Sequence, residues 1–429
     1  MAKRVRHQPP RSAIRQCPLE CLPQGFTDLQ GYDRVLVVFC WRTAVVTTAW
    51  LPVHRGCVSL SQLNDVSPKA AWPVWRLIFD RPPAAVPPLP SASVVVCTRD
   101  RTDDLDRCLQ SLSHVLSQGY EVIVVDNCPS TERTAQLMSR YPRIRYLREL
   151  RSGLNVARNT GLSAATGEIV AFTDDDAQVD SGWLSALLRN FDDPMVTAVT
   201  GLTLPLELET EPQQWFERTN SFARGFVSRQ FDLTKAGVFA AGQVGAGVNM
   251  ALRRRSLEEI GVFDEALDCG TPARSGGDQE FFYRVLARGH RIVYEPQALV
   301  WHRHRREWRA LRRTLYGYGV GVFAWWTRCL WVERELGLLW IAPRWFFRHH
   351  VWNVLRALLR RPQHLPLDLA LAGLFGALAG PCNFFRSRRR VRRQSPAASR
   401  APAVGSPQGH ADSPVPAPGT LAGQDLSAP

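Results

Sequence analysis

Residues 155–176 read NVARNTGLSAATGEIVAFTDDD, and this stretch decides the fold. The run EIVAFT (168–173) is apolar and β-branched, as a strand buried inside a parallel sheet should be. We expect a helix over 155–165 before it, closed by Gly167, because glycine commonly ends helices. Three carboxylates follow the strand directly: Asp174, Asp175 and Asp176. A helix, a buried strand and a polar strand end in this order are typical of an α/β domain.

The same alternation begins earlier in the chain. The runs SVVVC (93–97) and EVIVV (121–125) are continuous and apolar, which predicts two more buried strands. Apolar periodicity predicts helices over 104–118 and 131–140, and a third strand over 144–147. The rhythm predicts a mainly parallel, Rossmann-like sheet. Since ligands bind at the carboxyl ends of the strands in such sheets, polar residues at those ends are candidate site residues.

The three aspartates are the strongest of these candidates. Carboxylates this close repel one another unless a cation or hydrogen-bond donors compensate them. A divalent ion with oxygen ligands would do so, and it would also bridge a diphosphate. The alternative is a solvated acidic turn, or a cap for a helix that starts near Ser181. Their position directly after a buried strand favours the metal site.

Polar loops also follow the first two predicted strands. Residues 97–100 (CTRD) end the first and Asp126-Asn127 ends the second, so a base and a ribose could be held between them. Ordinary turn chemistry is the alternative, since Asp and Asn favour turns. Arg158 lies in a basic segment around a predicted helix start, where phosphate binds well. A solvated basic face is the alternative there.

Two residues outside this block are further candidates. Asp278 lies in GGDQE (276–280), before an apolar helical stretch, where it acts as a helix cap or as a general base. His302 follows a short predicted strand over 291–294, and a lone histidine is more often structural than a metal ligand. No GxGxxG follows the first strand, which argues against a nicotinamide enzyme.

Composition and linkers divide the 429 residues into four parts. Residues 1–90 contain a flexible leader to about residue 30, a small β-containing module with two strands in 34–50, and a linker with five prolines over 81–90. Residues 91–305 are the α/β domain. Residues 306–393 are helical, basic and aromatic, and 394–429 are expected to be disordered. Ten scattered cysteines without a CxxC pair indicate reduced thiols in a cytosolic compartment.

The C-terminal part suggests a membrane. Residues 369–385 carry no charge, and six arginines follow them in 386–393, a pattern typical of a membrane-associated segment with its basic end in the cytosol. Tryptophan and arginine in 325–361 suit an interfacial helix. The alternative is a helical hairpin packed on the α/β domain. We therefore expect a membrane surface as a partner, a location at the cytoplasmic face of the cell membrane, and no nucleic-acid partner, since RNA-recognition motifs and zinc fingers are absent from the sequence.

Taken together, the motifs resemble glycosyltransferase family 2, the inverting group with the GT-A fold, over about residues 92–305. The resemblance rests on five blocks in the family's order: SVVVCTRDR (93–101), EVIVVDN (121–127), GLNVARNTGLSAATGEIVAFTDDD (153–176), VNMALRRRSLEEIGVFDEAL (248–267) and GGDQEFFYRVLARGHRIVYEPQALVWH (276–302). Each block is weak alone, but their combined order is specific.

This resemblance implies the binding of a nucleotide-sugar donor. Thr98, Arg99 and Asp126 would contact the base, with Asp126 accepting a hydrogen bond from a uracil- or thymine-like edge. Arg158 would lie near the diphosphate. A uridine diphosphate sugar is the donor that the family resemblance favours.

The resemblance also implies a divalent metal, Mn²⁺ or Mg²⁺. Asp176, Asp174 and His302 would be its ligands. Asp174 would in addition lie near the donor ribose, with Asp175 close to it.

Asp278 matches the family's catalytic base, although Gly277 stands where the family commonly has a glutamate. The implied reaction moves a sugar, with inversion, to a hydroxyl group of a glycan or lipid-linked acceptor, as in cell-surface polysaccharide or glycolipid synthesis. Two alternatives remain: a nucleotidyltransferase, which also pairs carboxylates with a metal, and a catalytically degenerate protein that binds a nucleotide sugar or a membrane.

Overall fold

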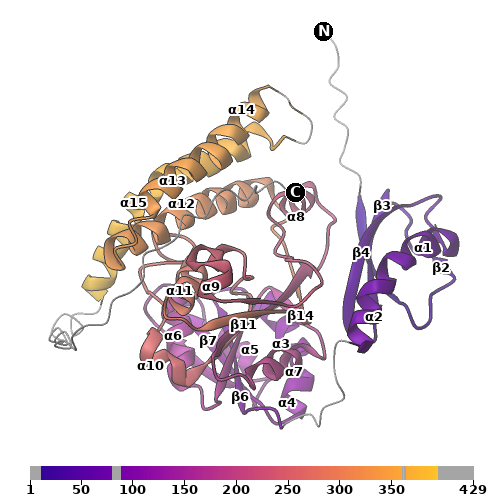
Figure 1. Cartoon of the computed structure of the whole chain (residues 1–429). Coiled ribbons are helices and arrows are strands. Elements are labelled where there is room, and N and C mark those ends of the chain that lie inside the picture. The colour runs from indigo at the N-terminus through magenta and orange to yellow at the C-terminus, as the bar shows by residue number, and fades with distance from the viewer. Residues whose placement is uncertain (1–10, 80–87, 360, 362–363, 395–429) are drawn as a thin grey trace.

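The computed structural model describes residues 11–79, 88–359, 361 and 364–394 (Figure 1). Residues 1–10 of the expected leader, most of the proline-rich linker and residues 395–429 of the expected tail lie outside the described residues. A mixed sheet forms the centre of the molecule, a smaller strand module lies on one side of it, and a layer of long helices lies on another (Figure 1).

The central sheet has nine strands in the order β10-β14-β11-β13-β9-β6-β7-β8, with β12 paired to β14 off this path. Their bounds are β6 (Ala92–Thr98), β7 (Glu121–Asn127), β8 (Arg145–Glu149), β9 (Ile169–Asp174), β10 (Ala177–Val179), β11 (Val196–Pro205), β12 (Arg229–Phe231), β13 (Asn249–Arg253) and β14 (Arg291–His302). Neighbouring strands from β9 to β8 are parallel, whereas β13 runs antiparallel to both of its neighbours. The predicted α/β class and the four predicted strands are confirmed, and the apolar runs of β6, β7 and β9 are buried, whereas β8 at the end of the sheet is half-buried or exposed.

Helices cover the sheet as the periodicity predicts. They are α3 (Thr102–Ser111), α4 (Ser113–Ser117), α5 (Arg133–Met138), α6 (Leu154–Ala164), α7 (Trp183–Leu188), α8 (Glu211–Asn220), α9 (Leu233–Ala236), α10 (Leu257–Ile260) and α11 (Gly277–Ala287). The role predicted for Gly167 is wrong. Helix α6 ends at Ala165 in an extended conformation, and a Cβ atom on Gly167 would lie 2.5 Å from the backbone of Ala92. Glycine is required there because β6 passes so close.

The strand predicted over residues 291–294 is longer than expected. It continues to His302 as β14 and pairs with β11 on both sides of an irregularity, where the register jumps from Gly201↔Glu295 to Leu202↔Leu299. Pro296 lies inside this bulge and conceals the strand in the sequence, because proline interrupts a regular ladder. The extension brings His302 beside Ala177 of β10.

The N-terminal module contains two sheets and two helices. Strands β1 (Ser12–Pro18), β3 (Arg34–Trp41) and β4 (Ala44–Pro52) form the larger sheet, β2 (Gly25–Phe26) pairs with β5 (Val58–Ser59), and α1 (Leu60–Val66) and α2 (Ala71–Phe79) follow. The two strands predicted in 34–50 are confirmed. The expected leader is wrong for residues 12–18, because β1 pairs in parallel with β3.

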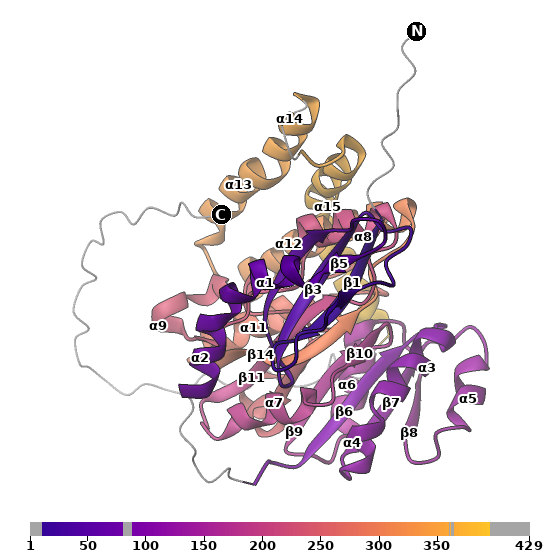
Figure 2. The same ribbon diagram turned by 90° about the vertical axis from the view of Figure 1, so that its right-hand side faces the viewer.

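The module is packed against the central domain. One face of β3 and β4 points inward, and its side chains Leu36, Val38, Cys40 and Val45 belong to the same buried cluster as Phe172 of β9. Figure 2 shows β1 and β3 alongside the β14 side of the central sheet. The first strands of the chain thus extend the hydrophobic core of the α/β domain.

The C-terminal part is helical. It contains α12 (Trp308–Val332), α13 (Leu338–Trp345), a π-helical segment (Phe346–Val351), α14 (Trp352–Leu358) and α15 (Leu367–Gln394). Helices α12 and α15 pack closely, because a Cβ atom on Gly319 would lie 2.3 Å from the carbonyl oxygen of Gly373. Among the described residues, α15 is the one helix whose length and composition would allow it to cross a membrane. In its most apolar stretch, 44% is buried inside the protein.

Candidate functional site

The aspartate cluster lies at the sheet edge where β6 and β9 end. Strand β9 ends at Asp174, and the turn into β10 leaves Asp175 and Asp176 almost fully buried. The hydroxyl group of Thr98, at the end of β6, donates to Oδ2 of Asp175 at 2.8 Å. Nε2 of His302 lies 3.3 Å from Oδ1 of Asp176, since the ladder between β10 and β14 brings the histidine beside the turn.

Three of these residues could hold a metal ion. Potential ligand atoms of Asp174, Asp176 and His302 all lie within 4.8 Å of one another. Burial raises the pKa of Asp174, and it raises the pKa of Asp175 to about 7. The cluster thus holds more carboxylate than its neighbours compensate, and two carboxylates with one imidazole suit a divalent cation such as Mn²⁺.

Two arginines that the sequence did not single out complete the cluster. Nη1 of Arg101 lies 3.0 Å from Asp175 and 2.9 Å from Asp176, and Nη1 of Arg305 lies 3.0 Å from Oδ2 of Asp176. Burial alone would raise the pKa of Asp176, but His302, Arg305 and Arg101 together hold it well below its ordinary range. Both arginines bind Oδ2, so Oδ1 remains directed toward His302.

Arg99 and Asp126 lie in different environments. Arg99 is exposed and donates to the hydroxyl group of Ser152 at 3.1 Å. Asp126 is buried at the end of β7, and its Oδ2 accepts a hydrogen bond from the Tyr146 hydroxyl group at 2.9 Å. Its Oδ1 is buried without a hydrogen-bond partner among the described residues. Burial raises the pKa of Asp126, because the charged carboxylate loses its contact with water. A further hydrogen-bond donor at Oδ1 would stabilise the charged form.

Arg158 is buried in α6 and paired with an aspartate that sequence reasoning missed. Its Nη1 lies 2.9 Å from Oδ2 of Asp268 and 3.1 Å from Oδ1 of Asn155. Burial alone would lower the pKa of Arg158, but Asp268, Asp174 and Asp278 together outweigh that effect and raise it. Asp268 therefore compensates much of the charge that was expected to act on a diphosphate, and no local sequence pattern marks that partner.

Asp278 is the second residue of α11, and Gly276, with a φ of 94°, occupies the cap position. Oδ2 of Asp278 accepts a hydrogen bond from the N–H of Gly247 at 2.8 Å, and Oδ1 of Asp278 accepts one from the N–H of Gln279 at 2.8 Å. Gly277 has no room for a side chain, because a Cβ atom there would lie 2.2 Å from Nδ2 of Asn155. The glutamate that the family commonly has at this position would not fit.

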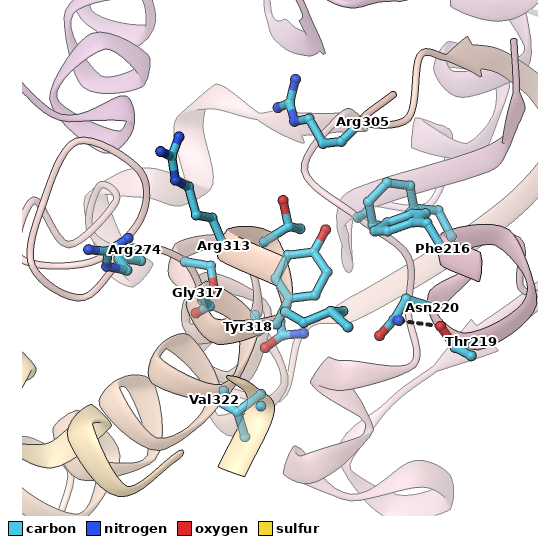
Figure 3. A pocket seen from close by; sticks show the side chains of 18 of the residues that line it. Phe216, Thr219, Asn220, Arg274, Arg305, Arg313, Gly317, Tyr318 and Val322 are labelled. Atoms are coloured by element: carbon cyan, nitrogen blue, oxygen red, sulfur yellow. Dashed lines mark hydrogen bonds between the residues drawn. The ribbon is translucent and has the colours of Figure 1, made fainter. Parts of the chain in front are cut away.

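A cavity of about 1000 Å³ joins these groups (Figure 3). Six charged or titratable residues discussed above line its inner end: Arg158, Asp174, Asp268, Asp278, His302 and Arg305. Five other predicted residues lie outside its lining, namely Thr98, Arg99, Asp126, Asp175 and Asp176. The structure thus brings the candidate base and two of the candidate metal ligands to one cavity, with the third ligand, Asp176, beside them.

Comparisons with known proteins show a family match for part of the chain. Residues 93–261 match the family model for glycosyl transferase family 2. The pre-mycofactocin glycosyltransferase of Mycobacterium tuberculosis is 33% identical over 284 residues, which cover 62% of this chain and 55% of that relative. The glycosyltransferase AglE of Haloferax volcanii is 24% identical over 294 residues, which cover 66% of this chain and 87% of the relative. The chain thus spans about half the length of its mycobacterial relative.

Among solved structures, the chain is similar to the mannosyltransferase PcManGT from Pyrobaculum calidifontis in complex with GDP-Man and Mn²⁺, with a TM-score of 0.42 and 17% identity. The match covers 76% of this chain and 81% of that one. The family match and the mixed sheet with its strand-end aspartates agree with the fold that the sequence predicted. Over residues 93–261 the chain is therefore similar to glycosyl transferase family 2, and its mixed α/β sheet is typical of the GT-A fold.

Proposed function

We propose that the chain transfers a sugar, with inversion, from a nucleotide-diphosphate sugar to a hydroxyl group of a glycan or lipid-linked acceptor. The observation that carries this proposal is that Asp278 lines the same cavity end as Asp174 and His302. The match of residues 93–261 to a glycosyltransferase family supports it. A base and a cation site that share one cavity are what a direct displacement at a sugar phosphate needs.

A uridine diphosphate sugar is the donor that we propose. Within the part of the chain that the structure describes, the buried Oδ1 of Asp126 has no hydrogen-bond partner, and it complements the imide N–H of a uracil ring. Thr98 and Arg99 lie at the end of the neighbouring strand β6, and Arg158 lines the cavity.

Asp174, Asp176 and His302 would hold a divalent metal, Mn²⁺ or Mg²⁺. Such an ion supplies positive charge to the diphosphate, which becomes more negative as the bond to the sugar breaks. The donor set fits this role, since it combines two carboxylates with one imidazole and lies next to the buried carboxyl group of Asp175.

Asp278 would act as the general base. Its carboxylate takes the proton from the acceptor hydroxyl group, and the oxygen attacks the anomeric carbon from the face opposite the departing diphosphate. The N–H groups of Gly247 and Gln279 hold the carboxylate in a fixed orientation. One displacement inverts the anomeric centre and needs no nucleophile from the protein.

Product analysis separates this reaction from nucleotidyl transfer. The protein is incubated with Mn²⁺, a panel of nucleotide sugars and candidate acceptors, and the released nucleotides and phosphates are quantified. Release of a nucleoside diphosphate together with glycosylated acceptor supports the proposal. Pyrophosphate release from a nucleoside triphosphate and a sugar phosphate would identify a nucleotidyltransferase, and a folded protein without either product would identify a degenerate one.

We also propose attachment to a membrane surface at the cytoplasmic face. The segment from Leu336 to Leu359 alternates arginines with large apolar side chains that are exposed in the described structure: Leu336, Leu339, Trp340, Phe347, Trp352, Leu355, Leu358 and Leu359. Trp340 is 84% exposed. A basic helix with an exposed apolar face lies in the interface of an anionic bilayer. Such attachment would suit glycolipid or cell-surface polysaccharide synthesis.

We expect the full-length protein to sediment with phosphatidylglycerol vesicles and much less with phosphatidylcholine vesicles. Replacing both Trp340 and Phe347 by serine should weaken vesicle binding about tenfold or more, because each ring buries apolar area in the interface. Trp72→Ser, at a residue of α2 that is 64% exposed, is the matched control and should bind as the wild type does. A wild-type protein that stays in the supernatant with anionic vesicles would refute the membrane proposal.

A further inference from the structure

The cavity extends well beyond the catalytic end. Its outer part is formed by the end of α8 with the loop to Arg224, by Arg274 and Ser275 before α11, by one side of α12, and by lining residues of the π-helical segment, α14 and the start of α15. The three carboxylates of the cavity lining, Asp174, Asp268 and Asp278, all lie at the inner end. The outer part therefore has a separate chemical character, which donor binding does not explain.

Cationic side chains without acidic partners face this outer part. Not every arginine of the lining is available to a ligand. The charges of Arg158 and Arg305 are compensated, since Arg158 pairs with Asp268 and Arg305 pairs with Asp176. Three more arginines, Arg224, Arg274 and Arg313, form no ion pair with any carboxylate among the described residues.

Each of these three arginines remains able to bind an anion. Arg224 donates to the backbone carbonyl oxygen of Ser221 at 2.8 Å, and burial lowers its pKa, so an anion at this point would stabilise its charge. The guanidinium group of Arg274 lies over the ring of Tyr316, 5.2 Å from its centre. In the view of Figure 3, Arg313 extends from α12 into the same opening as Arg274.

An apolar wall lies beside these charges. Phe216, Leu315 and Leu369 form a buried cluster against which Phe222 and Leu365 pack, and all five line the cavity. Leu369 belongs to α15, which contacts α14 and the π-helical segment, and residues of both of these also line the cavity. A ligand that fits must combine an anionic group with a hydrocarbon segment.

The charged region also lies close to the candidate base. Asp278 is near enough to act electrostatically on Arg224 and on the hydroxyl group of Tyr318, which lines the cavity next to Arg313. Arg224 and Tyr318 therefore connect the candidate base with the cationic outer part of the same cavity.

From this arrangement we infer that the acceptor is a phosphate-bearing lipid, with its phosphate bound by Arg224, Arg274 and Arg313 and its hydrocarbon segment against the apolar wall. This inference rests on the proposed function and names the acceptor class for it. The hydroxyl group that accepts the sugar lies on the inner side of the phosphate, and the chain leads out toward the membrane-facing helices.

Calorimetric binding to the full-length protein tests this inference without any turnover. The probes are dodecyl phosphate below its micelle concentration, dodecyl maltoside as the uncharged amphiphile, and inorganic phosphate as the anion without a chain. We expect dodecyl phosphate to bind at least about tenfold more tightly than either other probe, because a charge-assisted hydrogen bond and the chain burial act together.

Arg313→Gln should weaken dodecyl phosphate binding about tenfold. Arg309→Gln is the matched control, since Arg309 lies one helical turn earlier on α12, is exposed and does not line the cavity. Equal binding by the two variants would overturn the inference, as would equal binding of dodecyl maltoside or of inorganic phosphate. Nucleotide binding is measured on the same proteins. If nucleotide binding is absent while dodecyl phosphate binds as expected, the proposed sugar transfer is refuted, but the binding site for a lipid phosphate is supported.

Discussion

Replacing Asp278 by asparagine is expected to lower kcat for sugar transfer about 10²- to 10⁴-fold, the usual contribution of a general base. Asparagine has nearly the same shape as aspartate, but it cannot take the proton from the acceptor hydroxyl group. Its oxygen can still accept one of the two N–H groups, from Gly247 or Gln279, that hold the carboxylate. Donor binding should therefore stay close to that of the wild type, and the loss should appear in kcat.

The measurement is steady-state release of nucleoside diphosphate with the preferred donor and acceptor, together with donor binding on the same variant. Asp65→Asn, at an exposed position of α1, is the control for the same chemical change far from the cavity. A value of kcat for Asp278→Asn within a few-fold of the wild type would show that another group removes the proton.

Replacing Glu280 by glutamine should lower the free energy of unfolding by about 3 to 5 kcal/mol, the usual cost of breaking a buried ion pair on one side. Glu280 is fully buried, two residues beyond Asp278 on α11. It accepts Nε of Arg284 at 2.6 Å and lies 2.8 Å from Nη1 of Arg328 on α12. The change leaves two buried guanidinium groups without their shared carboxylate, and it loosens the contact between these helices.

Urea unfolding followed by tryptophan fluorescence measures this loss. Glu259→Gln is the matched control, because the carboxylate of Glu259 is exposed and pairs with His290. Removing this charge should lower the free energy of unfolding by less than about 1 kcal/mol. If Glu280→Gln and Glu259→Gln cost the same, Glu280 does not anchor α11. The position of Asp278 would then have to depend on the contact with Gly247.

The parts of the fold that the sequence predicts are those that local patterns determine. Continuous apolar runs such as SVVVC and EIVAFT mark strands buried on both faces, and the aspartates after EIVAFT mark the strand end that carries the cluster. Strand β1 escaped prediction because Arg15 and Gln16 interrupt its apolar pattern, and its pairing with β3 stabilises it instead. Pro296 conceals the full length of β14 for a similar reason, since the strand continues past a bulge.

The site shows the same limit. Asp174, Asp176 and His302 could be proposed from family motifs, but the pairing of Arg158 with Asp268 joins residues 110 positions apart. Arg305 and Asp176 are separated by 129 positions. No local sequence pattern marks either pair. Arg305 reaches Asp176 because β14 pairs with β10, and Asp268 reaches Arg158 because the loop before α11 packs against α6. The cationic outer cavity is likewise assembled from α12 and loops that have no common motif.

The central claim is that the aspartate cluster binds a metal and a nucleotide-sugar donor. Its most direct test is equilibrium binding of UDP, GDP, dTDP, CDP and their sugars, with and without Mn²⁺, to the wild type and to Asp176→Ala. The account predicts Mn²⁺-dependent binding, tightest for the uridine compounds, that is lost in Asp176→Ala while the variant remains folded. A folded wild-type protein that binds none of these nucleotides, or that binds them equally well without metal, would contradict it.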